Sequence, residues 1–190
     1  MIDIGTGDGR AVLRLAGAEP STLAIGIDAV ADAMADASRR AARPVRKGGL
    51  PNALFVVAAA EALPAELWGS ADEVTIQFPW GSLLRGLVGQ DAVLCEAVAR
   101  LLRPGGRLTL VLSIIERDRS VTLGALDDPG LQGIARAFER VGLLVGEIRQ
   151  VESAEARAIG SSWARRLRAA GAGRPAWWLR FERPRTRPQG

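Results

Sequence analysis

Two stretches of this 190-residue chain combine residue types and spacing that suit a ligand site. The first is "DIGTGDG", Asp3 to Gly9, where Gly5 and Gly7 would let the backbone pass close to a ligand that a Cβ atom would keep away. Asp28 ends an apolar run about twenty residues later, where a carboxylate can accept hydrogen bonds from both ribose hydroxyls. Together they predict a nucleoside-containing cofactor; a tight strand–helix turn without a ligand is the alternative.

The charges beside this loop select among cofactors. A dinucleotide loop has the spacing G-x-G-x-x-G and leaves its helix N-terminus clear for a pyrophosphate. Here the spacing is G-x-G-x-G, and both Asp3 and Asp8 place negative charge beside the loop. Carboxylates repel a pyrophosphate and attract a ligand that carries an ammonium group. S-adenosylmethionine carries an ammonium and a sulfonium, so the loop favours this cofactor, and a dehydrogenase is the least favoured reading.

The second stretch is "QFPWGSLLRG", residues 77–86, in which a proline precedes Trp80 directly after an apolar run. An aromatic ring displayed in such a turn could stack on a planar base. Trp80 as a core anchor is the alternative, but a core tryptophan is more natural within a strand or a helix. The turn therefore indicates a binding role for Trp80.

Apolar runs alternate with helical spacing and so define the elements that would position these residues. We predict strands at 1–4, 23–28, 54–60, 72–78, 107–113, 143–151 and 176–183, and helices at 11–17, up to about 42, after the turn at 77–80, and at 87–103, 127–142 and 154–170. "RPGG", residues 103–106, is predicted to turn the chain into the fifth strand. The alternation implies an α/β fold with a doubly wound, mostly parallel sheet and helices on both faces. Residues 1–183 are expected to form one domain and 184–190 a disordered basic tail.

Composition excludes several kinds of chemistry. The chain has no histidine and a single cysteine, Cys95, which rules out a Ser-His-Asp triad and an internal disulfide and argues against a zinc site. No metal is expected. No apolar run approaches the roughly 18 residues of a membrane span, and the composition predicts a cytoplasmic protein. Any chemistry must use carboxylates, backbone, aromatic rings or a cofactor.

The positive charge is unevenly distributed. The formal net charge is only +4, but Arg39 to Lys47 contains five cations and no acid. From Ser161 to the end there are eight arginines and one acid, Glu182. Such blocks are either solvated segments or a binding surface for a polyanion, and composition alone does not decide between them.

Three strings along the first half, "DIGTGDG", "GID" and "AAAEALP", resemble the class I S-adenosylmethionine-dependent methyltransferases. The resemblance implies a Rossmann-like seven-stranded fold and a cofactor held by the following residues: Asp3, Gly5, Thr6 and Gly7 around the methionine end, Asp28 on the ribose, and Ala60 and Glu61 beside the adenine. Glu61 also suits a helix start, where the dipole favours an acid.

Three rarer strings, "RKGGLPN", "PWGSLLRG" and "SSWARRL", resemble a narrower family, the aminoglycoside-resistance methyltransferases that modify N1 of adenine 1408 in 16S rRNA. In that family two tryptophans clamp the flipped adenine, and the matching positions here are Trp80 and Trp163. The resemblance further implies cofactor contacts from Gln77, Phe78, Pro79, Ser82 and Ser162, and RNA contacts from Arg43, Arg46, Lys47, Arg165 and Arg166. By itself, Trp163 also fits the core face of an amphipathic helix with Leu167.

The family resemblance carries expectations about partners and mechanism. The substrate would be 16S rRNA in the assembled 30S subunit and the enzyme a monomer; relatives have an N-terminal extension that this chain is expected to lack. Adenine N1 already carries a free lone pair, so positioning rather than a general base would drive transfer. The alternative functions are those of a tRNA guanine-N7 methyltransferase, a small-molecule methyltransferase and a non-catalytic rRNA-binding relic.

Trp177 and Trp178 are expected to pack on opposite faces of the sheet.

Overall fold

In the computed structural model the described residues are 1–113, 127–152, 155 and 175–185. Their strands are β1 (Ile2–Ile4), β2 (Ala24–Asp28), β3 (Ala53–Val57), β4 (Ala71–Gln77), β5 (Leu102–Leu112), β6 (Leu144–Gln150) and β7 (Trp177–Glu182). Their α-helices are α1 (Arg10–Ala18), α2 (Ala31–Ala41), α3 (Gly81–Val88), α4 (Ala92–Leu101) and α6 (Asp128–Arg140). Among the described residues, two short 3₁₀ helices, η1 (Val45–Lys47) and η2 (Ala65–Leu67), lie in connections.

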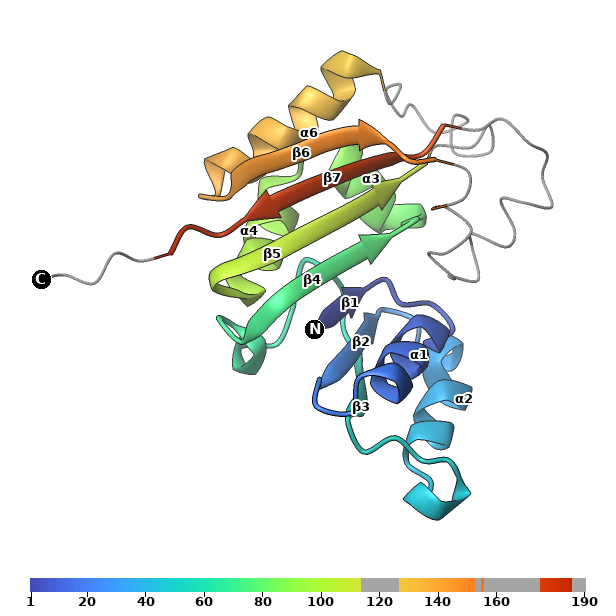
Figure 1. Ribbon diagram of the computed structural model, residues 1–190. Coiled ribbons are helices and arrows are strands. Elements are labelled where there is room, and N and C mark those ends of the chain that lie inside the picture. The colour runs from blue at the N-terminus through green and yellow to red at the C-terminus, as the bar shows by residue number, and fades with distance from the viewer. Residues whose placement is uncertain (114–126, 153–154, 156–174, 186–190) are drawn as a thin grey trace, which may run out of the picture.

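The strands form one sheet in the order β3-β2-β1-β4-β5-β7-β6 (Figure 1). Every neighbouring pair is parallel except those of β7, which runs antiparallel to both β5 and β6. This confirms the predicted doubly wound, mostly parallel sheet and its last two strands, whose antiparallel pairing the sequence did not predict. The strand order reverses between β1 and β4, which is the point where open α/β sheets bind ligands.

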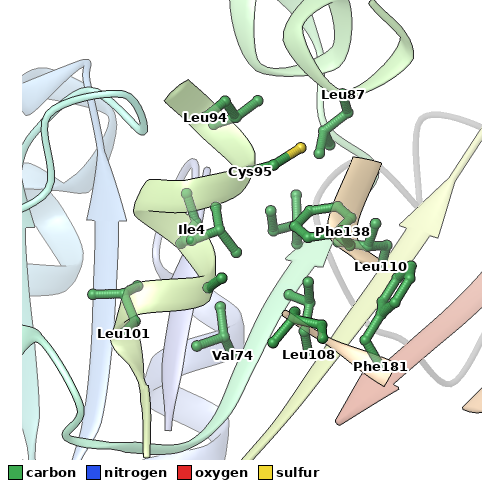
Figure 2. Packing of buried hydrophobic residues seen from close by; sticks show 14 of the residues in the cluster. Ile4, Val74, Leu87, Leu94, Cys95, Leu101, Leu108, Leu110, Phe138 and Phe181 are labelled. Atoms are coloured by element: carbon green, nitrogen blue, oxygen red, sulfur yellow. The ribbon is translucent and has the colours of Figure 1, made fainter. Parts of the chain in front are cut away.

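Helices cover both faces of the sheet. On one face α1 and α2 pack on β2 and β3 through small side chains, among them Ala24, Ala37 and Ala53. On the other face α3, α4 and α6 enclose the larger core, where the rings of Phe138 and Phe181 lie 4.9 Å apart between centroids (Figure 2). Cys95 lies in this core, and burial raises the pKa of its thiol to about 11, so it stays protonated at neutral pH.

Two predicted elements differ from the structure. The helix predicted at 87–103 is broken: α3 ends at Val88, and α4 starts after Asp91, whose carboxylate caps it by accepting hydrogen bonds from the amides of Val93 and Leu94. The predicted turn at 103–106 instead lies within β5. Between the pairs Leu102–Ala71 and Arg107–Glu73 the register shifts, so the extra residues form a bulge.

Successive side chains of β7 point to opposite faces of the sheet, and this decides where its two tryptophans pack. Trp177 packs against the larger core, whereas Trp178 packs with Phe78 and Val111 in a separate cluster. The prediction that they lie on opposite faces of the sheet is confirmed.

Gly9 joins the glycine loop to α1, and its replacement by alanine is expected to destabilise the fold. Its φ is +68°, and a Cβ there would lie 2.5 Å from Cε1 of Phe55 and 2.7 Å from Cβ of Ala37. Left-handed strain costs about 1–2 kcal/mol, and overpacking typically adds about 1–3 kcal/mol. Urea unfolding should therefore show a loss of about 2–5 kcal/mol. Gly17→Ala, a helical site with no neighbour within 4 Å, is the control and should not destabilise the chain.

Candidate functional site

A cleft opens at the carboxyl edge of the sheet, beside the switch point between β1 and β4. It is bordered by the segments that follow β1, β2, β3 and β4 and by the start of α3. Its lining residues are Ile4, Gly5, Ile27, Asp28, Ala29, Val30, Ala58, Ala59, Ala60, Glu61, Pro79, Trp80, Gly81, Ser82 and Leu83. Of the predicted cofactor residues, the structure brings Gly5, Asp28, Ala60, Glu61, Pro79 and Ser82 to this cleft.

The glycine loop folds back over the end of β2. The amides of Gly5 and Thr6 both donate to the carbonyl of Ile27, at 2.8 and 3.1 Å. Gly5 has a φ of +71°, and a Cβ there would lie 2.8 Å from Cδ2 of Leu83, across the cleft. Only glycine allows this backbone to line the cleft so closely, which is the role predicted for it.

Asp28 fastens the loop and still has acceptor capacity. One carboxylate oxygen accepts the amide of Gly7 and the other accepts the amide of Val30, both at 2.9 Å. Each oxygen therefore keeps a lone pair for a further donor, since a carboxylate has about four acceptor positions. Two such oxygens at the rim of a cleft suit the paired hydroxyls of a ribose.

Asp3 lies beneath the cleft rather than in its lining. The residue is only 4% exposed, and its Oδ1 accepts the hydroxyl of Thr75 from β4 at 2.7 Å. Burial raises the pKa of Asp3, and the charge of Asp28 adds to this, while the hydrogen bond from Thr75 lowers it. The Thr6 hydroxyl, which also lowers the pKa of Asp3, is itself buried and lacks a partner of good hydrogen-bond geometry among the described residues. Contact of either residue with a cofactor stays a prediction.

The raised pKa of Asp3 gives a testable pH dependence. The folded chain holds a proton at Asp3 more tightly than the unfolded chain, so this group favours folding at low pH. That contribution is lost as the pH rises through the raised pKa. Asp3→Asn should therefore raise the Tm at pH 7, by about 2–4 °C for each kcal/mol recovered, and the gain should shrink toward pH 4. Thermal unfolding across this range checks it; a gain that grows on acidification would contradict the sign.

The turn after β4 separates two neighbouring side chains. Phe78 has a φ of +48°, and its amide donates to the carbonyl of Val111 at 2.7 Å. Its ring is buried in a cluster with Val111, Val151 and Ala176, away from the cleft lining. Trp80 is 57% exposed and lines the cleft, which argues against its role as a core anchor. Gln77 and Gly7 also lie outside the lining, so their cofactor contacts, like that of Phe78, stay predictions.

The segment after β3 also lines the cleft, through Ala58, Ala59, Ala60 and Glu61. Glu61 is in a turn that precedes η2, so the alternative of a helix-start acid has no helix at this position. Sequence reasoning missed the apolar lining residues Ile4, Ile27, Ala29, Val30, Ala58, Ala59 and Leu83. Val30, two residues after Asp28, is 50% exposed. A large apolar residue two positions after a strand-end acid was the signal that could have identified it.

The first basic group lies at the other edge of the sheet. Arg43, Arg46 and Lys47 are exposed in the connection between α2 and β3. Because α2 runs back from the carboxyl edge and β3 starts at Ala53, opposite the first residue of β2, this connection lies at the amino edge (Figure 1). The structure therefore does not bring these cations to the cleft.

Four predicted site residues, Ser162, Trp163, Arg165 and Arg166, and the predicted helix 154–170 lie outside the described residues, apart from Glu155. Most of the predicted basic tail, 186–190, does so too. Within the described part of the chain no helix is long and apolar enough to cross a membrane. In the same part there is no group of three or more acidic or cysteine side chains that could hold a metal ion.

The chain is similar to known proteins over nearly its whole length. The family described as "NpmA: 16S rRNA (adenine(1408)-N(1))-methyltransferase" matches residues 1–180. A 16S rRNA (adenine(1408)-N(1))-methyltransferase of Escherichia coli is 32% identical over 176 residues, which cover 87% of this chain and 79% of the relative. One from Streptoalloteichus tenebrarius is 33% identical over 172 residues, or 88% and 79% of the two chains.

Solved structures agree with the sequence relatives. The crystal structure of a mutant 16S rRNA (adenine(1408)-N(1))-methyltransferase with cosubstrate SAM, from Catenulisporales acidiphilia, has a TM-score of 0.86 and 34% identity, covering 100% of this chain and 86% of that one. The structure of the 16S rRNA methyltransferase KamB has a TM-score of 0.85 and 30% identity, and the match covers 96% of this chain and 86% of KamB. The chain belongs to the family of 16S rRNA (adenine(1408)-N(1))-methyltransferases.

Proposed function

We propose that this chain transfers a methyl group from S-adenosylmethionine to N1 of adenine 1408 in 16S rRNA and so confers aminoglycoside resistance. The proposed substrate is the rRNA in the assembled 30S subunit, and the proposed working form is a cytoplasmic monomer. One observation carries the proposal: Trp80 lines the same cleft as Gly5 of the glycine loop and Asp28. This cleft lies at the switch point of the sheet, and the family to which the chain belongs is described as methylating this adenine.

The residues of the cleft fit S-adenosylmethionine. The free lone pairs of Asp28 suit the ribose hydroxyls, and the glycine loop lets the backbone approach the ligand where side chains would block it. Val30, Ala59 and Ala60 offer apolar surface for an adenine ring. When bound, the cofactor supplies an electrophilic methyl group on a cationic sulfur.

The chain's own contribution to transfer is positioning. N1 lies on the pairing edge of adenine, so the base must leave its stack before it can react. Trp80, at the rim of the cleft, offers a ring on which the extruded base can stack, which offsets part of that cost by about 1–3 kcal/mol. N1 carries its own lone pair, so no side chain has to remove a proton. After transfer the base is cationic, and an indole face stabilises that charge.

Reverse transcription across the decoding site tests the proposal. Purified 30S subunits are incubated with the chain, with and without S-adenosylmethionine, and the rRNA is then used as template. Methylation of N1 blocks base pairing, so a stop at adenine 1408 that depends on the cofactor is expected. Read-through in both samples, from a chain shown to be folded by its thermal transition, would overturn the proposal.

A further inference from the structure

The connection that carries Arg43, Arg46 and Lys47 is folded against itself. Within it the amide of Lys47 donates to the carbonyl of Pro44 at 2.7 Å, and the amide of Gly49 donates to the same carbonyl at 3.2 Å. The amide of Gly48 donates to the carbonyl of Val45 at 2.9 Å. The loop 43–49 thus satisfies three of its own amides and has a definite shape before any partner binds.

Gly49 is the point where this loop closes. It is buried, and a Cβ there would lie 1.6 Å from the carbonyl oxygen of Arg43 and 2.5 Å from its carbonyl carbon. Backbone atoms cannot move aside as a side-chain end can, so any other residue would force the loop open. The next residue, Leu50, donates its amide to Ala41 at 2.9 Å and packs on the small-residue core beneath α1 and α2.

Asn52 fastens the other end of the connection to the body of the domain. The side-chain nitrogen of Asn52, Nδ2, lies 2.9, 3.0 and 3.2 Å from the backbone carbonyl oxygens of Thr22, Ala16 and Glu19. These three residues are at the end of α1 and in the connection to β2. Its own carbonyl accepts the amide of Ala24 at 2.8 Å. One side chain thereby satisfies carbonyls that would otherwise lack partners near the end of α1.

The cations of the loop are available for a partner. Arg43, Arg46 and Lys47 are exposed, and none of them makes an ion pair within the part of the chain that the structure describes. Arg39 in the neighbouring helix, in contrast, pairs with Asp36. The string "GGLPN" that follows the cations has no assigned role in the cofactor cleft, and its glycine and asparagine instead hold the loop.

We propose that Gly49 and Asn52 are positioning residues that keep Arg43, Arg46 and Lys47 as a preformed docking surface for RNA phosphates. The inference rests on the proposed function, because it takes rRNA as the partner. A flexible segment would lose the freedom of each long side chain and of its backbone on binding, and a preformed loop avoids part of that cost. Phosphate contacts of this kind set register and affinity without reading sequence.

The experiment measures the affinity of Gly49→Ala and Asn52→Ala for 30S subunits at several salt concentrations. We expect each to bind about 10-fold more weakly than the unchanged chain, with a shallower dependence of log K on log salt because fewer phosphates are neutralised together. The affinity for S-adenosylmethionine should not change, since the cleft lies at the other edge of the sheet. Gly106→Ala is the matched control: its Cβ would also meet backbone, 2.7 Å from the carbonyl oxygen of Ala71, but far from the loop, and it should keep normal 30S affinity.

Hydrogen exchange on the free, unchanged chain gives an answer that needs no variant. The amides of Lys47, Gly48 and Gly49 should be protected at least about 10-fold relative to an unstructured segment. Unprotected exchange at all three would overturn the inference, and so would folded Gly49→Ala and Asn52→Ala chains that bind 30S subunits normally.

A charge variant separates this inference from the proposed function. The combined change Arg43→Ala, Arg46→Ala and Lys47→Ala should weaken 30S binding more than either positioning variant. If it weakens binding while Gly49→Ala and Asn52→Ala do not, the loop binds RNA but is not preorganised by these residues. If the unchanged chain gives no stop at adenine 1408 with the cofactor, the proposed function fails, whereas the exchange result still reports on the loop.

Discussion

Trp80→Ala is expected to lower methyl transfer to 30S subunits by about 100-fold while changing the affinity for S-adenosylmethionine by less than about 3-fold. The loss of one base-stacking face corresponds to about 1–3 kcal/mol, or about 5- to 150-fold. The fold should tolerate the change, because Trp80 is 57% exposed. Single-turnover transfer of a labelled methyl group measures the first quantity, and calorimetric titration of the cofactor measures the second.

Another tryptophan on the same chain provides the matched control. Trp68 is 49% exposed at the amino edge of the sheet, where the guanidinium carbon of Arg100 lies 5.0 Å from its ring centroid. Trp68→Ala removes an indole of similar exposure that does not line the cleft and should leave transfer unchanged. Trp80→Phe keeps an aromatic face and should retain part of the rate. If Trp80→Ala transfers normally, or if Trp68→Ala loses as much, the stacking role of Trp80 is wrong.

Asp28→Asn is expected to have the opposite signature, with weak cofactor binding and normal RNA binding. Each carboxylate oxygen now accepts one backbone amide, from Gly7 or Val30. The amide group of asparagine would turn an NH₂ toward one of these donors, loosen the glycine loop and offer the ribose one acceptor fewer. Hydrogen bonds to charged groups are worth about 1.5–3 kcal/mol, so the affinity for S-adenosylmethionine should fall by about 10- to 100-fold.

The control for Asp28 is the same substitution on a neighbouring helix. The side chain of Asp36 is 95% exposed, and it pairs with Arg39 on the surface of α2. Asp36→Asn should change neither cofactor affinity nor the affinity for 30S subunits. A cofactor affinity that survives Asp28→Asn would show that the ribose is not held at this end of the cleft.

The position of the main cleft residues could be predicted from the amino-acid sequence. A glycine loop after one buried strand and an acid at the end of the next must meet, because the carboxyl ends of parallel neighbours lie at one edge of the sheet. This reasoning placed Gly5 and Asp28 correctly in space. It also placed Trp80 outside the core, since a residue after proline at a strand end has left the strand's alternation.

Other positions were decided only by tertiary structure. Asp3 faces Thr75 and is buried, because β4 lies directly beside β1, a pairing of residues 72 apart that no local pattern contains. Phe78 and Trp80 diverge because a left-handed residue turns the chain, and the cluster that holds the Phe78 ring includes residues from both sides of the connection between β6 and β7.

For the basic loop 43–49, the sequence predicts the charge, whereas tertiary contacts decide the position and the shape. Its charge and the string "GGLPN" are plain in the sequence, but composition could not tell a solvated segment from a docking surface. Its position follows from the direction of α2, which carries the chain to the edge of the sheet opposite the cleft. Its shape follows from one close backbone contact at Gly49 and from the three carbonyls around Asn52. Local sequence specifies which groups the loop displays, whereas contacts with residues up to 36 positions away decide where and how rigidly it displays them.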